Sequence, residues 1–315
     1  MSWICPICST NNDNNAKTCI VCDAERPKSA LGFDLNAQML KVSGQLSKMS
    51  AVDKRSPEER YAEAKALFRS NPSEGFSKML DSARDGIAEA QYLVGYEYYR
   101  GKIVDKDYGE AIYWLDGAAK QGIVDAQCFL GICYLFADGD YQNYDLAFFW
   151  FKKASEAGHS GAQNRLADCY AYGRGVEKND ELAFKWYSKS AAQKHPWGLY
   201  HLAWCYLDGK GVNKNHGTAV RYFNEAIEQG SIPAYSGLAY CYDNGYGVIK
   251  NSRKATEYYI KAAEGGLASA QYSLGTRYEK GTGVKADISK AIMWYRKAAA
   301  QGYDKAVTAL KRLKV

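Results

Sequence analysis

Four cysteines near the start of the chain have the spacing of metal ligands. Cys5 and Cys8 form one C-x-x-C pair, and Cys19 and Cys22 form a second pair after ten intervening residues. Two such pairs can place four thiolates tetrahedrally around one zinc ion. So short a segment cannot build a stable core, and the ion would supply most of its folding energy. The pattern predicts one structural Zn²⁺; the alternative is a redox-active or incidental set of cysteines.

Trp3 and Asn12 extend this spacing to the pattern W-x-C-x2-C-x3-N-x6-C-x2-C. Over residues 1–27 the chain therefore resembles the Ran-binding-protein-type (NZF) zinc finger. The resemblance implies a small zinc knuckle domain. In such a domain the indole of Trp3 would pack on the knuckle, and the amide of Asn12 would brace the loop.

The binding residues of that family are matched poorly. Ubiquitin-binding members resemble one another in a Thr-Phe pair where this chain has Ser-Thr at 9–10, and in a bulky apolar residue at the place of Val21. Members that bind single-stranded RNA carry a stacking Trp where this chain has Asp13, and an Arg pair where it has residues 14–16, Asn-Asn-Ala. A protein partner or a structural role is favoured; binding of RNA or of a ubiquitin-like protein by the finger is the alternative.

Catalysis is not expected from the other chemistry-bearing side chains. None of the four histidines accompanies a Cys or Ser in a nucleophile context: His159, His195, His201 and His216. The sequence contains no second metal cluster and no pair of catalytic carboxylates. The G-x-G-V strings, such as residues 173–176, follow a predicted helix and lack a third glycine, which argues against a nucleotide-binding loop.

Most of the chain consists of copies of a 36-residue unit, which is seen clearly in residues 270–305. Aligned on their first small residue, the copies start at Ala90, Ala126, Ala162, Gly198, Ala234 and Ala270, each 36 residues after the last. Tyr recurs eight positions after each start, and Ala recurs twenty-one positions after it. A fixed period of this length is typical of a solenoid, in which each unit buries its apolar face against its neighbours.

Each unit is predicted to form two antiparallel helices, A and B. Gly ends helix A in five of six copies, which suits a left-handed cap. A column of short polar residues is placed to cap helix B: Asp107, Asn143, Asn179, Asn215, Asn251 and Asp287. A bulky aromatic 24 positions after each start is expected in the core: Trp114, Trp150, Trp186, Tyr222, Tyr258 and Trp294. A further column is expected to be a buried row of thiols: Cys133, Cys169, Cys205 and Cys241.

The unit resembles the Sel-one-like repeat (SLR), a longer relative of the tetratricopeptide repeat, in the pattern A-x-x-x-L-G-x-x-Y-x-x-G-x-G-V-x-x-D/N-x-x-x-A-x-x-W-Y-x-x-A-A-x-x-G. The resemblance implies an all-α fold, a right-handed α–α superhelical solenoid of helix pairs. The predicted domains are the finger (1–27), a linker with a candidate short helix (28–56), a degenerate first helix pair (57–87), six repeats (88–303) and a C-terminal capping helix (304–315).

By analogy with tetratricopeptide-like superhelices, helix A faces the concave side, and positions two, six, nine and ten after each start should line a groove. Aromatic, Arg, Asn and Asp side chains at these positions suit recognition of a peptide. The alternative is that many of the tyrosines only fill the contact between repeats. Trp197 is added because the glycine that closes helix B is replaced just before it. The candidate residues are Tyr92, Tyr96, Tyr99, Arg100, Phe136, Tyr172, Trp197, Tyr200, Trp204, Asp208, Tyr240 and Asn244.

Composition narrows the class of function. The chain has 315 residues, and its formal net charge of +6 is too small to indicate nucleic-acid binding. No apolar run approaches the roughly 18 residues of a membrane span, and the N-terminus lacks the features of a secretory signal. Nine cysteines, an odd number, suit a reducing compartment, so a cytoplasmic location is predicted. The sequence predicts a non-enzymatic interaction scaffold whose groove binds a protein or peptide partner and whose finger is a second binding or structural module.

Overall fold

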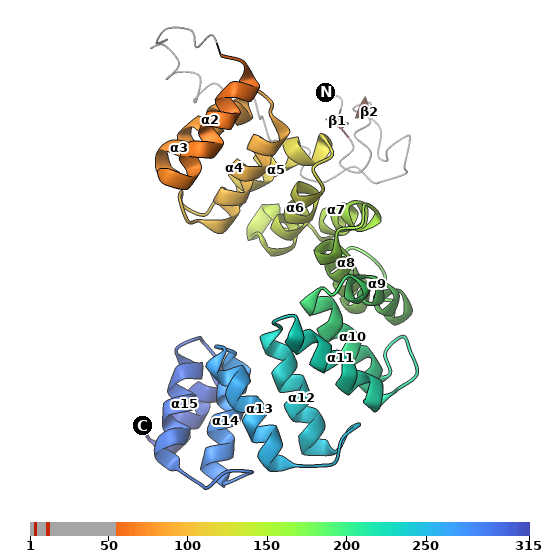
Figure 1. The fold of residues 1–315 in the computed structure, drawn as a ribbon, viewed down its shortest axis with the longest axis vertical. Helices are drawn as coiled ribbons and strands as arrows, with labels where there is room; N and C mark the ends of the chain where they lie inside the picture. Colours follow the sequence, from red (N-terminus) through yellow and green to blue (C-terminus); the bar gives the residue numbers. More distant parts are fainter. Residues whose placement is uncertain (1–2, 5–10, 13–54) are drawn as a thin grey trace. The chain divides into compact units, whose positions relative to one another are not determined.

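The structure, a computed structural model, describes residues 3–4, 11–12 and 55–315. The predicted zinc ligands Cys5, Cys8, Cys19 and Cys22 and most of the predicted linker lie outside the described residues. The chain divides into two compact units, Met1–Trp150 and Phe151–Val315. Figure 1 labels most of the elements of both.

The first unit contains a short antiparallel ladder and a series of helices. Strand β1 (Trp3–Ile4) pairs with β2 (Asn11–Asn12), and the register sets Trp3 opposite Asn12. The other elements are α2 (Pro57–Ser70), α3 (Pro72–Arg84), α4 (Ala88–Arg100), α5 (Tyr108–Lys120), α6 (Val124–Phe136), the 3₁₀ helix η2 (Gly139–Tyr141) and the first half of α7 (Tyr144–Glu156).

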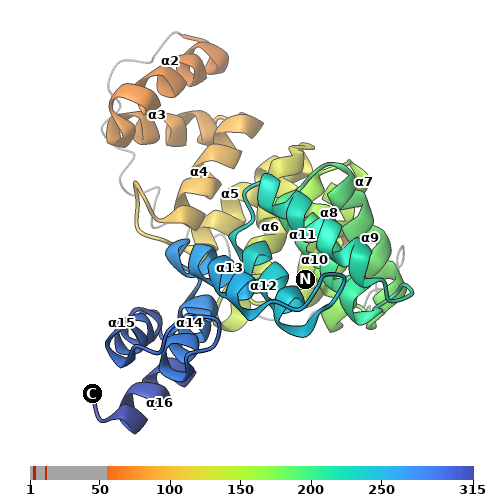
Figure 2. The same ribbon diagram turned by 60° about the horizontal axis from the view of Figure 1, so that its bottom comes forward.

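The described residues of the second unit are helices and loops. After the end of α7 they form α8 (Ser160–Tyr172), α9 (Asp180–Ala192), α10 (Pro196–Asp208), α11 (His216–Glu228), α12 (Ile232–Asn244), α13 (Ser252–Glu264), α14 (Ala268–Lys280), α15 (Ile288–Ala299) and α16 (Asp304–Leu313). Figure 2 shows these helices from a second direction, with α16 also labelled. The helices pack in the predicted pairs, for example α10 with α11 and α12 with α13. Among the described residues, none of the helices combines the length and the apolar character that a membrane crossing needs.

The predicted helix caps are confirmed. The Oδ1 of Asn215 accepts a hydrogen bond of 2.9 Å from the backbone N–H of Thr218, and the other five column members cap their B helices in the same way. Helix A ends at glycines with φ between 65° and 77°: Gly101, Gly173, Gly209, Gly245 and Gly281. At the end of α9, where other B helices are closed by glycine, Lys194 takes this left-handed conformation with φ 56°.

The second glycine of the G-x-G string allows a close contact between repeats. At Gly211, with φ 67°, a side chain would collide with the carbonyl oxygen of Asp180 at the start of the preceding B helix. Gly247 and Gly283 approach the preceding B helices at His216 and Ser252 in the same way. The string therefore has a packing role, in keeping with the argument against a nucleotide-binding loop.

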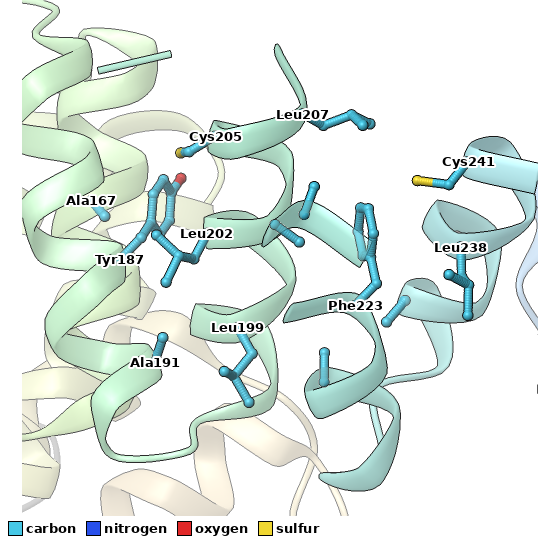
Figure 3. Packing of buried hydrophobic residues seen from close by; sticks show 14 of the residues in the cluster. Ala167, Tyr187, Ala191, Leu199, Leu202, Cys205, Leu207, Phe223, Leu238 and Cys241 are labelled. Carbon is cyan, nitrogen blue, oxygen red and sulfur yellow. The ribbon is translucent and has the colours of Figure 1, made fainter. Parts of the chain in front are cut away.

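The prediction for the aromatic column is correct only in part. Trp114, Trp150 and Trp294 are buried. The other three rings are half-buried and lie under basic side chains; for example, the Nζ of Lys189 lies 3.9 Å from the ring centroid of Trp186. In five of the six repeats the side chain at the next position along the chain is buried more deeply than the aromatic: Leu115, Phe151, Tyr187, Phe223 and Tyr295. Figure 3 shows two of them, Tyr187 and Phe223, among the buried side chains of neighbouring helices.

The predicted row of thiols is confirmed. Cys133, Cys169, Cys205 and Cys241 are buried and unpaired. Burial raises the pKa of each of these thiols to about 12, so they stay protonated and unreactive at neutral pH. In the last copy Arg277 takes the place of the cysteine and is also buried. Its guanidinium donates two hydrogen bonds, of 2.7 and 3.0 Å, to the carboxylate of Asp243.

Candidate binding surface

In the first unit, four predicted groove residues form a cluster on α4. The rings of Tyr92 and Tyr96 stack with their centroids 5.9 Å apart. Phe129 of α6 closes the cluster, with its centroid 4.7 Å from that of Tyr96 and 5.5 Å from that of Tyr99. The guanidinium carbon of Arg100 lies 5.1 Å from the centroid of Tyr96, within cation–π range. These tyrosines are half-buried, in large part by one another and by Phe129.

In the second unit, four predicted groove residues form a continuous series of rings, which we call the aromatic row: Trp197, Tyr200 and Trp204 of α10 and Tyr240 of α12. Successive centroids are 5.9, 6.3 and 5.8 Å apart. The first two pairs are nearly perpendicular, with interplanar angles of 88° and 77°. Trp197 and Tyr240 are exposed, by 46% and 39% of their surface. The row thus presents ridges of aromatic surface to solvent.

The aromatic row lines a pocket of about 400 Å³. This volume falls within the range of about 300–1,000 Å³ that is typical of ligand-binding pockets. The rest of the lining comes from α12, α13 and the start of α14, and no lining residue is charged: Pro233, Ser236, Tyr259, Leu267, Ser269 and Ser273. The pocket is therefore neutral and mainly aromatic.

Two polar atoms of the pocket-lining residues lack a hydrogen bond of good geometry within the described chain. They are the indole Nε1 of Trp204, which interacts with the hydroxyl of Tyr200, and the Oγ of Ser236, and both atoms are themselves buried. Beneath them, Phe223 of α11 is fully buried, with its centroid 5.5 Å from that of Trp204. The floor of the pocket is therefore part of the rigid core.

The remaining predicted groove residues are not part of either cluster. Phe136 and Tyr172 are exposed, by 48% and 63%, at the ends of α6 and α8. Asp208 is exposed and has the Nζ of Lys210 3.8 Å from its Oδ2. Asn244 donates a hydrogen bond of 2.9 Å from its Nδ2 to the carbonyl oxygen of Tyr240, one turn earlier in its own helix.

A buried polar cluster behind the aromatic row was missed by the sequence analysis. Asp168 of α8 accepts a hydrogen bond of 2.7 Å from the hydroxyl of Tyr187. It also forms an ion pair with Arg165, with 3.3 Å between the charged atoms. The Nε2 of His201 lies 3.9 Å from Asp168, and its ring stacks on that of Tyr187 at 4.9 Å. His201 in turn contacts Trp197, at 6.0 Å between centroids. His201 therefore supports the aromatic row from within α10.

Burial favours the neutral form of His195 and His201. Burial lowers the pKa of His201, although Asp168 opposes the effect, and burial also lowers the pKa of His195. The Nδ1 of His195 accepts a hydrogen bond of 3.3 Å from the backbone N–H of Gly198 and so caps α10. His159, one repeat earlier, caps α8 through the N–H of Ala162 at 3.0 Å. A periodic pair of histidine caps is readable in the sequence by its 36-residue spacing; the contact of His201 with Asp168 is not.

Two solved structures resemble the chain over most of its length. A Sel1 repeat protein from Oxalobacter formigenes is 27% identical with a TM-score of 0.69, and the match covers 76% of this chain and 96% of that one. A protective antigen of uropathogenic Escherichia coli with an SLR fold is 27% identical with a TM-score of 0.64. That match covers 89% of this chain, which spans 59% of the length of the antigen. Among curated proteins, none matches the chain.

The repeats themselves match a family profile, described as Sel1 repeat. It matches residues 88–123, 124–159, 160–195, 198–231, 232–267 and 268–303, which together make up more than half of the chain. Each match covers one helix pair, from α4 with α5 to α14 with α15. The six predicted repeats are therefore confirmed, and the chain belongs to the Sel1 repeat family.

Proposed function

We propose that this protein is a non-enzymatic scaffold that binds an extended segment of a partner protein at the aromatic row. Sel1 repeat proteins generally act as protein-interaction scaffolds. The observation that carries the proposal is the neutral pocket lined by Trp197, Tyr200, Trp204 and Tyr240. Exposed Trp and Tyr side chains over a rigid floor are the usual anchors of protein interfaces. The unpaired column thiols fit a reducing compartment such as the cytoplasm.

The test is a selection of peptides from a random linear display library on the full-length chain. We expect peptides that bind the wild type and do not bind Trp204→Ala, because truncating a central aromatic anchor removes most of the binding energy. Trp186→Ala is the matched control, since Trp186 is a half-buried Trp of the same unit on a B helix. If the wild type and Trp204→Ala select the same peptides, the aromatic row is not the binding surface.

The second part of the proposal is that Cys5, Cys8, Cys19 and Cys22 bind one zinc ion as thiolates. The spacing supports it, and so does the ladder that pairs Trp3 with Asn12 on either side of the first C-x-x-C in the sequence. Elemental analysis of the purified chain should give one zinc per chain, and Cys5→Ser should lower that content. Retention on single-stranded RNA that decreases steeply with salt would favour the RNA-binding alternative for the finger.

A further inference from the structure

Basic side chains are concentrated at the C-terminal end of the second unit. Residues 250–315 contain 14 Lys and Arg against 5 Asp and Glu, a formal net charge of +9. The rest of the unit, residues 151–249, contains 11 basic and 9 acidic side chains. Residues 1–150 have the opposite excess, with 16 basic against 21 acidic side chains. A local excess of one sign attracts a partner of the opposite sign.

Four lysines of this region occupy equivalent positions in the last two repeats. We call them the lysine face: Lys254 and Lys261 of α13, and Lys290 and Lys297 of α15. All four are exposed. The two lysines of each helix are seven residues apart, which is two turns or about 10 Å along one side of the helix. Since α14 packs against both α13 and α15, and equivalent positions of successive repeats face the same way, the four ammonium groups share one side of the solenoid.

Each lysine of this face lies over an aromatic ring. The distances from Nζ to the ring centroid are between 4.2 and 5.6 Å, and the rings are, in the same order, Tyr242, Tyr258, Tyr278 and Trp294. A cation–π contact holds an ammonium group in place and leaves N–H donors available to an acceptor from outside. Side chains that are already held lose less conformational entropy when a partner binds.

The chain supplies little negative charge to the lysine face. Among the described residues, Lys254, Lys261 and Lys297 form no ion pair, and Lys290 has only Asp287, whose Oδ2 lies 3.8 Å from its Nζ. Glu257, on the same helix as Lys254, lies 4.0 Å from Arg253. The positive charge of this surface is therefore not neutralised within the described chain.

Helix packing does not account for these lysines. At the same two repeat positions the first repeat has Glu110 and Gly117, and the fourth repeat has Thr218 and Glu225. The helices of those repeats pair as the helices of the last two repeats do. Lysine at both positions occurs only in the last two repeats, so it is a property of this surface rather than a requirement of the fold.

The state of the rings indicates which kind of acidic partner fits. They are buried or half-buried and lie beneath the lysines, so they offer no free face on which a nucleotide base could stack. Carboxylates need only the ammonium groups. An extended polypeptide advances about 3.3 Å per residue, so about twelve residues, roughly 40 Å long, would reach both pairs of lysines.

From these observations we infer that the lysine face binds an acidic, extended segment of a partner protein through ion pairs with its four ammonium groups. This surface lies on B helices and is separate from the aromatic row, so the inference does not rest on the binding proposed there.

The direct test uses two labelled twelve-residue peptides and the full-length chain. One peptide repeats Glu-Glu-Gly four times, and the other repeats Gln-Gln-Gly. Fluorescence anisotropy at low ionic strength should give a dissociation constant at least about tenfold lower for the acidic peptide, because several individually weak ion pairs add together. That affinity should decrease as salt is added, since the charges are exposed. Equal affinities for the two peptides would overturn the inference.

Replacement of the lysine face by glutamine locates the site. The variant combines Lys254→Gln, Lys261→Gln, Lys290→Gln and Lys297→Gln, and its affinity for the acidic peptide should decrease at least about tenfold. The matched control has glutamine in place of four other exposed lysines of the unit: Lys178, Lys185, Lys210 and Lys214. The control has the same net charge as the first variant and should retain most of the affinity. Equal losses would show that net charge alone attracts the peptide, which would contradict a defined site.

Two further measurements decide between kinds of partner and between surfaces. If a labelled oligothymidine of twelve nucleotides binds more tightly than the acidic peptide, and the glutamine variant of the lysine face abolishes this binding, the surface recognises nucleic acid and the inference is refuted. Trp204→Ala should bind the acidic peptide as the wild type does. A loss of affinity in Trp204→Ala would place the acidic peptide at the aromatic row instead.

Discussion

In each unit a phenylalanine ring packs against the aromatic cluster, but the two rings come from different positions of the repeat. In the first unit, Phe129 of α6 packs on Tyr96 at 4.7 Å. Phe129 lies three positions after its repeat start, and the residue at this position in α12 of the second unit is Gly237. There, Phe223 of the preceding B helix supplies the ring and packs on Trp204 at 5.5 Å. The residue of the first unit at the repeat position of Phe223 is the smaller Leu115.

The difference teaches how a periodic chain acquires a local surface. A side chain at Gly237 would collide with the ring of Phe223, so the exchange of positions conserves the packed volume. In the first unit the ring comes from the same kind of helix as the tyrosines and closes over them. In the second unit the ring lies underneath as a floor, and Trp204 and Tyr240 line a pocket above it.

Phe223→Ala tests whether the ring of the B helix is the main support of the second unit. Phe223 is fully buried, and we expect a loss of about 3–5 kcal/mol in the free energy of unfolding, measured by chemical denaturation. Phe129→Ala should cost distinctly less, because that side chain is half-buried. Equal costs at the two positions would mean that the rings are equivalent supports.

Gly237→Ala tests the other half of the exchange. The added methyl group meets the ring of Phe223, and we expect destabilisation by about 1–3 kcal/mol in the same assay. Gly217→Ala in α11 is the matched control: its methyl group would meet no atom nearer than 3.6 Å, so this change should be neutral or stabilising. Equal destabilisation by both changes would show that the contact with the ring is not the cause, because helix propensity favours alanine over glycine at both positions.

Acid should destabilise the second unit selectively. All four histidines of the chain lie in it, and burial lowers the pKa of His195 and of His201 in the folded state. Below the unfolded pKa of about 6.5 the unfolded chain binds these protons and the folded chain does not, so stability is lost as the pH falls from there. Hydrogen exchange followed by mass spectrometry at pH 7.5 and 5.5 should show this loss in residues 151–315.

The contribution of His195, the N-cap of α10, to this acid sensitivity can be measured by substitution. His195→Asn keeps an N-cap side chain for α10 and removes one titrating group, so the dependence of exchange on pH should become weaker. His216→Asn, in α11, is the control and should leave the dependence as it is in the wild type. Acid sensitivity of the same size in residues 55–150 would contradict the assignment to the histidines.

Lys194→Gly should give the smallest effect. Lys194 adopts φ 56°, a conformation in which a residue with a side chain is strained, whereas Gly86 and Gly122 close the corresponding helices of the first unit. Relief of the strain exceeds the entropy cost of glycine, so a gain of about 0.5–1 kcal/mol is expected in chemical denaturation. The reverse change, Gly122→Lys, should cost a similar amount; no change in either variant would show that the backbone relaxes freely there.

Local signals made the helix pairs readable in the sequence. The caps at Asn215 and its column, the left-handed glycines and the 36-residue period each depend on a few neighbouring residues, and the structure has them where they were expected. The row of buried thiols followed from the same periodicity. The burial of half of the aromatic column was predicted wrongly. Two adjacent positions of helix B both carry apolar side chains, and the packing against helix A decides which of the two is more deeply buried.

Contacts between repeats could not be predicted from the sequence. The residues that surround Asp168 come from α8, α9 and α10, and the pocket of the aromatic row is lined from α10, α12, α13 and α14. The period determined that these helices would stack and which faces would meet. The sequence does not show whether a ring such as Phe129 or Phe223 packs over an aromatic cluster or beneath it. That depends on how the side chains of neighbouring repeats fill the space between their helices, which only the tertiary structure determines.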